Sequence, residues 1–160
     1  LYYLYLMFLY KKIIQNLIKK NITISIAESC TGGLLSTKIT SVSGVSKIFQ
    51  MGLVTYSNKA KSKILKIPKN FIFKNGSVSF ETAHSMVKNL KKISNSKLCI
   101  STTGISGPSG GTKEKPVGLV FIGINYKNKI TIYKKKFKGS RKEIQQKTVN
   151  SIFLIIKKLI

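Results

Sequence analysis

The chain has 160 residues, of which 29 are basic and four are acidic, so its formal net charge is +25. A chain of this length suits one domain with a self-sufficient core. The sequence contains one histidine and no aspartate, which excludes a Ser-His-Asp triad and an aspartate-based metal centre. The lysines are scattered along the whole chain, so we interpret the charge mainly as compositional bias. We expect no nucleic-acid partner, although the charge would still attract small anionic substrates.

The two cysteines, Cys30 and Cys99, lie far apart without a CxxC pair or a histidine cluster. This spacing suggests neither a zinc site nor a disulfide framework, and a reducing cytoplasm is the natural location. We expect no metal and no cofactor. Cys30 adjoins Ser29, so a thiol nucleophile is one interpretation of it; a small buried apolar side chain is the favoured one.

The first ten residues form an apolar and aromatic run that is followed by Lys11 and Lys12. This run is too short to span a bilayer, and its positive charge follows the apolar residues, whereas a secretory signal carries it before them. We therefore expect no membrane association. The run either opens a helix that continues through Ile18, which we favour, or forms an ill-ordered extension over residues 1–10.

A strand is predicted over Ile22–Ile26, where apolar residues alternate with threonine and serine. The motif AESCTGG, Ala27–Gly33, follows it, and a helical spacing of apolar residues begins at Leu35. Ser29 therefore lies in a strand-to-helix turn, where free N–H groups could bind an oxyanion or a phosphate. An ordinary loop would use the same residue types, so this segment alone leaves both interpretations open.

Strand and helix patterns alternate along the remaining chain, which predicts an α/β fold: a three-layer α/β/α sandwich around a mixed, largely parallel sheet, formed by a single domain over residues 1–160. The predicted segments are a strand at 49–56, a short helix at 58–65, a turn-rich connection at 68–76, a helix that starts at the N-cap Ser79, a strand at 98–102, strands at 117–126 and 130–137, and a helix at 141–159.

In such sheets the functional site gathers at loops that leave the carboxyl ends of strands. Three loops qualify: the Ser29 turn, the segment Thr55–Lys61 and the glycine-rich segment Thr103–Thr112. The third has four glycines in ten residues and allows close backbone approach to a ligand. It matches neither a P-loop nor a dinucleotide fingerprint.

Four motifs in register carry a family resemblance. AESCTGG, VTYSNKAK, GSVS before a helix and TGISGPSGGTKEKPVG occur in the order and spacing that resemble the C-terminal domain of the competence/damage-inducible protein CinA. The resemblance runs from about Ile13 onward. Stand-alone versions of that domain are nicotinamide-nucleotide amidohydrolases, often called PncC. The nucleotide-hydrolysing domain of the longer family members has no counterpart here, which favours a single-domain version, and the family resemblance implies a homodimer.

The resemblance implies a metal-free serine amidohydrolase that converts nicotinamide mononucleotide to nicotinate mononucleotide and ammonia. Ser29 matches the nucleophile, and Tyr56 and Lys61 match the residues that activate it. A desolvated lysine with a lowered pKa can replace histidine as the base for a serine. We expect the Ser29 hydroxyl, the Tyr56 hydroxyl and the Lys61 amine to converge in one crevice.

The expected substrate contacts come from the Ser29 turn, where backbone N–H groups are candidates for the oxyanion hole, and from the glycine-rich loop, where the phosphate would lie with Arg141 as a clamp. The residues in this set are Cys30, Thr31, Gly32, Gly33, Thr103, Gly104, Gly107, Gly110, Gly111 and Arg141.

Two positions depart from the family pattern, which commonly has an aspartate and a second arginine where this chain has Ser140 and Gln145. The role of Glu28 is open, because its carboxylate could orient the nucleophile loop or bind nearby backbone amides. The alternative function is a non-catalytic nucleotide- or nucleic-acid-binding domain. A phosphotransferase is disfavoured because the chain has neither an aspartate nor a P-loop.

Overall fold

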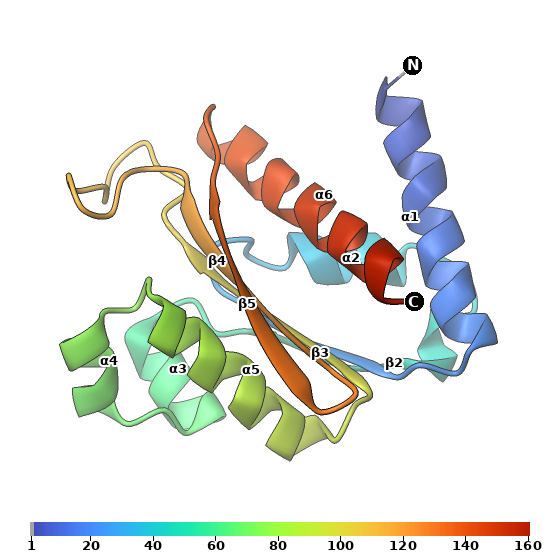
Figure 1. Ribbon diagram of the computed structural model, residues 1–160, viewed down its shortest axis with the longest axis horizontal. Coiled ribbons are helices and arrows are strands. Elements are labelled where there is room, and N and C mark those ends of the chain that lie inside the picture. The colour runs from blue at the N-terminus through green and yellow to red at the C-terminus, as the bar shows by residue number, and fades with distance from the viewer. Residues whose placement is uncertain (1) are drawn as a thin grey trace.

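The computed structural model describes residues 2–160, with side chains from Tyr5 onward (Figure 1). Leu1 lies outside the described residues. The elements in chain order are α1 (Tyr2–Lys19), β1 (Ile24–Glu28), α2 (Leu34–Thr40), the 3-10 turn η1 (Val45–Lys47), β2 (Phe49–Val54), α3 (Asn58–Leu65), α4 (Lys69–Asn75), α5 (Phe80–Ser94), β3 (Leu98–Gly104), β4 (Leu119–Tyr126), β5 (Lys129–Lys136) and α6 (Arg141–Leu159).

The strands form one sheet in the order β2-β1-β3-β4-β5. Strand β1 is parallel to β2 and β3, whereas β4 is antiparallel to both β3 and β5, so only β4 opposes the common direction. Helices α1, α2 and α6 cover one face, and α3, α4 and α5 cover the other (Figure 1). The predicted three-layer α/β/α sandwich around a mixed, largely parallel sheet is therefore confirmed.

Apolar side chains fill both interfaces between the sheet and its helices. On the α1/α2/α6 face, residues such as Ile14, Ile26 and Phe153 belong to one large buried cluster. On the opposite face, Leu65 and Met86 belong to a smaller cluster. Because every residue of β1 is buried, this strand is a rigid support for the turn that follows it.

The structure differs from the sequence prediction in the connection after α3. Residues 68–76 were predicted as turn-rich, but Lys69–Asn75 form α4, which begins directly after Pro68. Proline suits the start of a helix because its φ is fixed and no N–H is needed there. The helix is short and Ile72 is its one buried residue, so its sequence carries little helical periodicity.

The N-terminal run is helical from Tyr2, as the favoured interpretation predicted, and Leu6, Leu9 and Tyr10 are buried in the core. Within residues 2–160, no helix is sufficiently long and apolar to cross a membrane.

The parallel strands bring three chain segments to one edge of the sheet. In the strand register, Glu28 at the end of β1 pairs with Val54 of β2 and with Thr102 of β3. Backbone hydrogen bonds continue beyond the strands, because Thr55 N–H donates to Glu28 O at 2.8 Å and Ser29 N–H donates to Thr102 O at 3.0 Å. The Ser29 turn is therefore fixed between the ends of its two neighbouring strands.

Candidate active site

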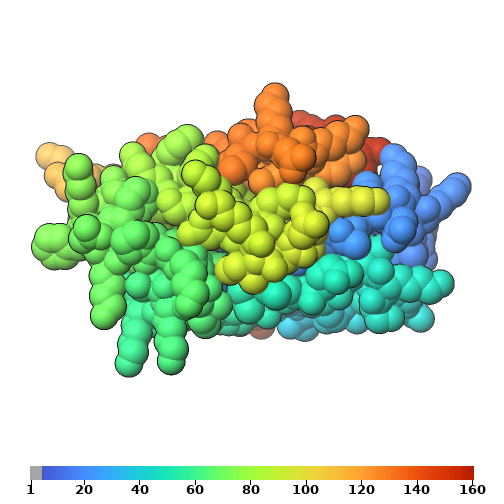
Figure 2. All heavy atoms as spheres, turned by 90° about the horizontal axis from the view of Figure 1, so that it is seen from below, coloured from blue at the N-terminus to red at the C-terminus, as the bar shows by residue number. Residues whose placement is uncertain are grey.

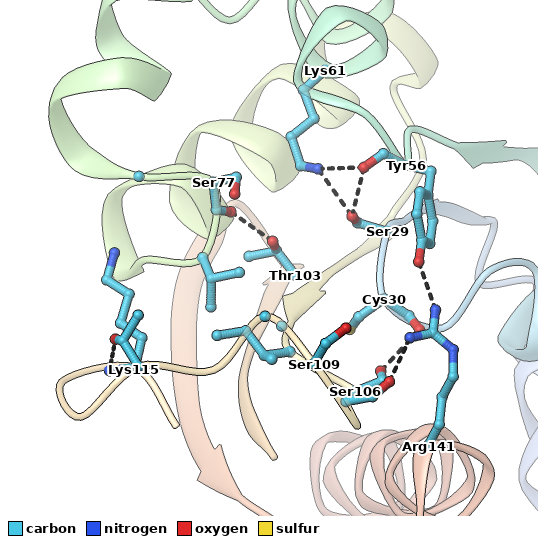
Figure 3. A pocket seen from close by; sticks show the side chains of 17 residues that line it. Ser29, Cys30, Tyr56, Lys61, Ser77, Thr103, Ser106, Ser109, Lys115 and Arg141 are labelled. Atoms are coloured by element: carbon cyan, nitrogen blue, oxygen red, sulfur yellow. Dashed lines mark hydrogen bonds between the residues drawn. The ribbon is translucent and has the colours of Figure 1, made fainter. Parts of the chain in front are cut away.

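Ser29 and Lys61 form a buried hydroxyl–amine pair (Figure 3). Lys61 Nζ donates to Ser29 Oγ at 2.9 Å. Lys61 lies in α3, whose N-terminus is capped by the Ser57 side chain, and only 1% of Lys61 is exposed. The Lys61 amine therefore lies within hydrogen-bond distance of the Ser29 hydroxyl, as predicted.

The surroundings of the Lys61 amine favour its neutral form. Besides Ser29, its hydrogen-bond partners are the carbonyl oxygens of Thr55 at 3.1 Å and Tyr56 at 3.2 Å, and neither is a carboxylate. Burial lowers the Lys61 pKa from 10.5 to about 8, because an apolar environment disfavours the charged ammonium. A tenth or so of the amine is therefore unprotonated at neutral pH and able to accept the Ser29 proton.

Tyr56 reaches this pair through its backbone and not through its hydroxyl. The Tyr56 carbonyl oxygen lies 3.4 Å from Ser29 Oγ and accepts a hydrogen bond from it. Tyr56 is 53% exposed as a residue, and its hydroxyl accepts a hydrogen bond from Arg141 at 2.6 Å. Ser29, Tyr56 and Lys61 line one cavity, as expected, but the Tyr56 hydroxyl bonds Arg141 and not Ser29, because the chain turns into α3 here and directs the ring toward Arg141 (Figure 3).

The N–H groups at the start of α2 are occupied by a carboxylate of the protein. Glu28 is fully buried, and its oxygens accept hydrogen bonds from the N–H groups of Gly33 at 3.1 Å, Leu35 at 3.1 Å and Ser36 at 2.8 Å. The carboxylate also accepts from Ser36 Oγ at 2.7 Å. Glu28 therefore binds the backbone amides, and through the Gly33 N–H it also holds the end of the nucleophile turn.

This arrangement corrects part of the predicted substrate set. Gly33 N–H serves Glu28, Gly32 N–H donates to Ser29 O at 3.1 Å, and the Thr31 hydroxyl bonds Thr102 Oγ1 at 2.9 Å inside the protein. None of these three residues lines the cavity in the described part of the chain. Two of the four candidate N–H groups of the serine turn, those of Gly32 and Gly33, therefore donate to acceptors within the protein.

Among residues 30–33 of the described chain only Cys30 lines the cavity, so its N–H group is the remaining candidate for an oxyanion hole. Within residues 2–160, the Cys30 N–H donates no hydrogen bond to another residue. Burial raises the pKa of the Cys30 thiol to about 12, so the thiol stays protonated. This favours Ser29 over Cys30 as the nucleophile.

A cavity of about 410 Å³ opens onto Ser29, a volume typical of small-molecule sites. It is lined by three cationic side chains and no acidic one in the described chain, so its electrostatics suit an anionic ligand. The lining residues are Ser29, Cys30, Tyr56, Lys61, Gly76, Ser77, Val78, Thr103, Gly104, Ile105, Ser106, Gly107, Ser109, Gly110, Thr112, Lys115 and Arg141.

The glycine-rich loop and the segment before α5 both contribute to the cavity wall, and they meet where Thr103 bonds Ser77 (Figure 3). Thr103, Gly104, Gly107 and Gly110 line the cavity as predicted, whereas Gly111 packs against the backbone of Val117 and does not. The loop therefore lines the cavity at four of the five predicted positions, and Gly111 serves its internal packing.

Sequence reasoning missed the contribution of Gly76, Ser77 and Val78. Thr103 Oγ1 donates to Ser77 O at 2.6 Å, which attaches this segment to the end of β3. The signal was the GSVS motif, which contributed to the family resemblance but received no role in the site. This segment follows a helix. The expectation that functional loops leave the carboxyl ends of strands therefore does not include it.

Arg141 connects two loops above the cavity. It is the first residue of α6, which starts with a capping box formed by Ser140 and Glu143. Its guanidinium donates to Gly107 O at 2.8 Å and to the Tyr56 hydroxyl at 2.6 Å. Serine at position 140 therefore preserves a helix cap where the family commonly has aspartate.

Comparison with known proteins identifies the family of this chain. The family description "CinA C-terminal domain" matches residues 7–160. A CinA-like protein from Fusobacterium nucleatum is 49% identical over 134 residues, which cover 84% of this chain and 32% of the relative. The chain spans about a third of the length of the curated relatives it matches.

Solved structures show the same fold. The competence/damage inducible protein CihA from Agrobacterium tumefaciens has a TM-score of 0.91 and 33% identity, with coverage of 96% of this chain and 94% of that one. A CinA superfamily protein from Enterobacter cloacae has a TM-score of 0.89 and 28% identity, with coverage of 97% and 92%. With the fold, the motifs and the match over residues 7–160 in agreement, the chain belongs to the CinA C-terminal domain family.

Proposed function

We propose that this protein is an amidohydrolase that deamidates nicotinamide mononucleotide to nicotinate mononucleotide. The observation that carries the proposal is the 2.9 Å contact between the buried Lys61 amine and the Ser29 hydroxyl at the wall of a cationic cavity. A serine next to an amine of lowered pKa is the arrangement that acyl transfer requires when no histidine is available. The family resemblance supplies the substrate class.

In the proposed reaction, neutral Lys61 accepts the Ser29 proton while Oγ forms a bond to the carboxamide carbon. The N–H group of Cys30, which lines the cavity, is the candidate to stabilise the resulting oxyanion, and one such donor typically contributes about 3 kcal/mol. The C–N bond then breaks, and the leaving nitrogen takes the proton from Lys61 and departs as ammonia. Water hydrolyses the acyl-serine, with Lys61 again as the base, which releases the carboxylate and restores the Ser29 hydroxyl.

The cationic residues at the cavity support the nucleotide as substrate. Arg141 and Lys115 both line the cavity, and the glycine-rich loop lies between them (Figure 3). Arg141 uses two of its five N–H groups on Gly107 and Tyr56, so others remain for a phosphate oxygen. We propose that the phosphate lies against Arg141 and this loop.

The direct test is release of ammonia from nicotinamide mononucleotide by the purified protein. We expect turnover by the wild-type chain and none above background by Ser29→Ala, with both proteins equally folded by circular dichroism. Binding of the nucleotide without ammonia release would overturn the hydrolase proposal and favour a non-catalytic nucleotide-binding domain. Equal ammonia release by both proteins would overturn the role of Ser29.

A further inference from the structure

We propose that Gln145 is a positioning residue for the nucleophile: it holds the Ser29 turn in place through the Cys30 carbonyl. The inference rests on the proposed hydrolase function and deepens it. Gln145 stands where the family commonly has arginine. Its role is therefore inferred from the contacts of Gln145 in this structure.

The Cys30 carbonyl is a junction of three segments. Gln145 Nε2, from α6, donates to Cys30 O at 2.9 Å, and Ser106 Oγ, from the glycine-rich loop, donates to the same oxygen at 3.3 Å. The preceding carbonyl, that of Ser29, accepts from Gly32 N–H at 3.1 Å. Both peptide groups on the C-terminal side of the nucleophile are thus held by hydrogen bonds to their carbonyls.

Helix α6 gives the Gln145 side chain a fixed base. The capping box at Ser140 fixes the start of the helix, and the neighbouring Ile144 is buried against the core. Arg141 and Gln145 are four residues apart and therefore share one side of the helix. Arg141 holds the glycine-rich loop at Gly107 O, while Gln145 holds the nucleophile turn. One helix face thus sets the relative placement of both loops.

The consequence for catalysis follows from the shorter of the two contacts. Without the Gln145 amide, the Cys30 carbonyl keeps only the weaker Ser106 contact, so the turn can rotate and Ser29 Oγ can drift from Lys61 Nζ. Displacement of a reacting group by about 1 Å can cost on the order of 10²-fold in rate. Because Gln145 does not line the cavity in the described chain, ground-state binding of the nucleotide should change little.

The test compares Gln145→Met with Gln146→Met. Methionine has a similar length but no N–H donor. Gln146 is the next residue of the same helix, is also half-buried and donates to Asn150 Oδ1 at 2.8 Å, away from the site. We expect Gln145→Met to lower kcat about 10- to 100-fold with KM within about twofold, and Gln146→Met to retain wild-type values.

Two further variants keep the result interpretable. Gln145→Arg restores an N–H donor and should recover most of the lost kcat, whereas Gln145→Glu keeps the side-chain shape without the donor and should lose activity as Gln145→Met does. If thermal unfolding shows that Gln145→Met does not fold, the comparison of kcat between Gln145→Arg and Gln145→Glu tests the role instead. Unchanged kcat in the variants without a donor, or a rise in KM alone, would overturn the role.

A fluorophosphonate probe separates this inference from the choice of substrate, because it reacts with an activated serine without any nucleotide. We expect its labelling rate at Ser29 to fall in Gln145→Met by about the same factor as kcat. Labelling of the wild-type chain without ammonia release would refute the substrate but leave Gln145 testable. No labelling of the wild-type chain would overturn both proposals.

Discussion

At the scale of single residues, Lys61 determines the chemistry because it is buried with carbonyl and hydroxyl partners and no carboxylate. A buried lysine normally has an ion-pair partner that keeps it charged. Here the three partners of the amine are Ser29 Oγ and the carbonyl oxygens of Thr55 and Tyr56. These partners suit a lysine that acts as a general base better than one that acts as a structural cation.

The Lys61 pKa of about 8 predicts the pH dependence of the reaction. Only the neutral amine can accept the Ser29 proton, so kcat/KM should rise about tenfold per pH unit below 8 and level off about one unit above it. Initial rates of ammonia release between pH 6 and 10 measure this profile. A flat or falling profile through this range would exclude Lys61 as the base.

Replacement of the neighbouring thiol tests which side chain is the nucleophile. Cys30 is buried and its pKa is raised to about 12, so Cys30→Ala should keep kcat/KM within about tenfold of the wild-type value, with a stability loss of about 1 kcal/mol. Steady-state kinetics and urea unfolding measure the two effects, with Ser29→Ala as the matched variant. Activity lost in Cys30→Ala but kept in Ser29→Ala would transfer the nucleophile role to the thiol.

At the scale of elements, the end of β1 and the start of α2 are joined by one carboxylate. Glu28 accepts hydrogen bonds from three backbone N–H groups and one hydroxyl, so it neutralises the positive end of a seven-residue helix. The turn between the two elements carries Ser29. The carboxylate thus stabilises the helix and the nucleophile turn together.

Glu28→Gln should lower the free energy of unfolding by about 1–3 kcal/mol, because the amide has one acceptor oxygen where the carboxylate has two. Urea denaturation monitored by circular dichroism measures the change. Glu81→Gln, at an exposed position in the first turn of α5, is the control and should stay within about 0.5 kcal/mol of the wild type. Equal effects of the two substitutions would show that the Glu28 contacts contribute little.

Helix α6 brings Arg141 to the cavity, and the proposed phosphate contact predicts a substrate-dependent loss. A hydrogen bond to a charged group contributes about 1.5–3 kcal/mol, so Arg141→Ala should lower kcat/KM for nicotinamide mononucleotide by about one to two orders of magnitude. Nicotinamide riboside lacks the phosphate and should lose far less. Equal losses for both substrates would indicate that Arg141 acts only through Gly107 and Tyr56.

At the scale of the whole molecule, the buried amine makes global stability depend on pH. The Lys61 pKa is about 8 in the folded chain and 10.5 without burial, so the unfolded state binds more protons between these values. Stability of the wild-type chain should therefore rise by about 3 kcal/mol from pH 8 to 10.5 through this residue. Below pH 8 the charged amine lowers stability in full.

Lys61→Met should lack this increase, which can be measured by urea unfolding at the two pH values. The exposed Lys63, in the same helix, provides the matched control, since Lys63→Met should keep the wild-type pH dependence. All other lysines are common to the three proteins, so the difference isolates Lys61. Parallel curves for wild type and Lys61→Met would contradict the lowered pKa.

The fold was predictable from the sequence because its periodic patterns are strong. The alternation at Ile22–Ile26 and the N-cap at Ser79 both identified real elements, and α6 has the predicted bounds. The Ser29–Lys61 pairing came from the family resemblance, because one lysine among so many carries no signal of its own.

Other features depend on side-chain direction and on competition for backbone donors, which a linear pattern does not contain. The exposed Tyr56 ring could not be distinguished from a buried one at a strand end. The capture of Gly33 N–H by Glu28 required the two to be placed together in space. Ser77 is part of the cavity wall because the fold brings it next to Thr103, which is far from it in the sequence.

The lysine excess has a further consequence at the border of the sheet. Strand β5 pairs only with β4 in the described chain, so one side of its backbone remains a template for a strand from another copy. Its last three residues, Lys134–Lys136, are all lysines, and β5 lies along the rim of the molecule in Figure 2. Electrostatic repulsion between the lysines of two β5 strands opposes pairing of these strands between molecules. Because 1 M salt shortens the screening length to about 3 Å, concentrated salt should weaken this protection against aggregation.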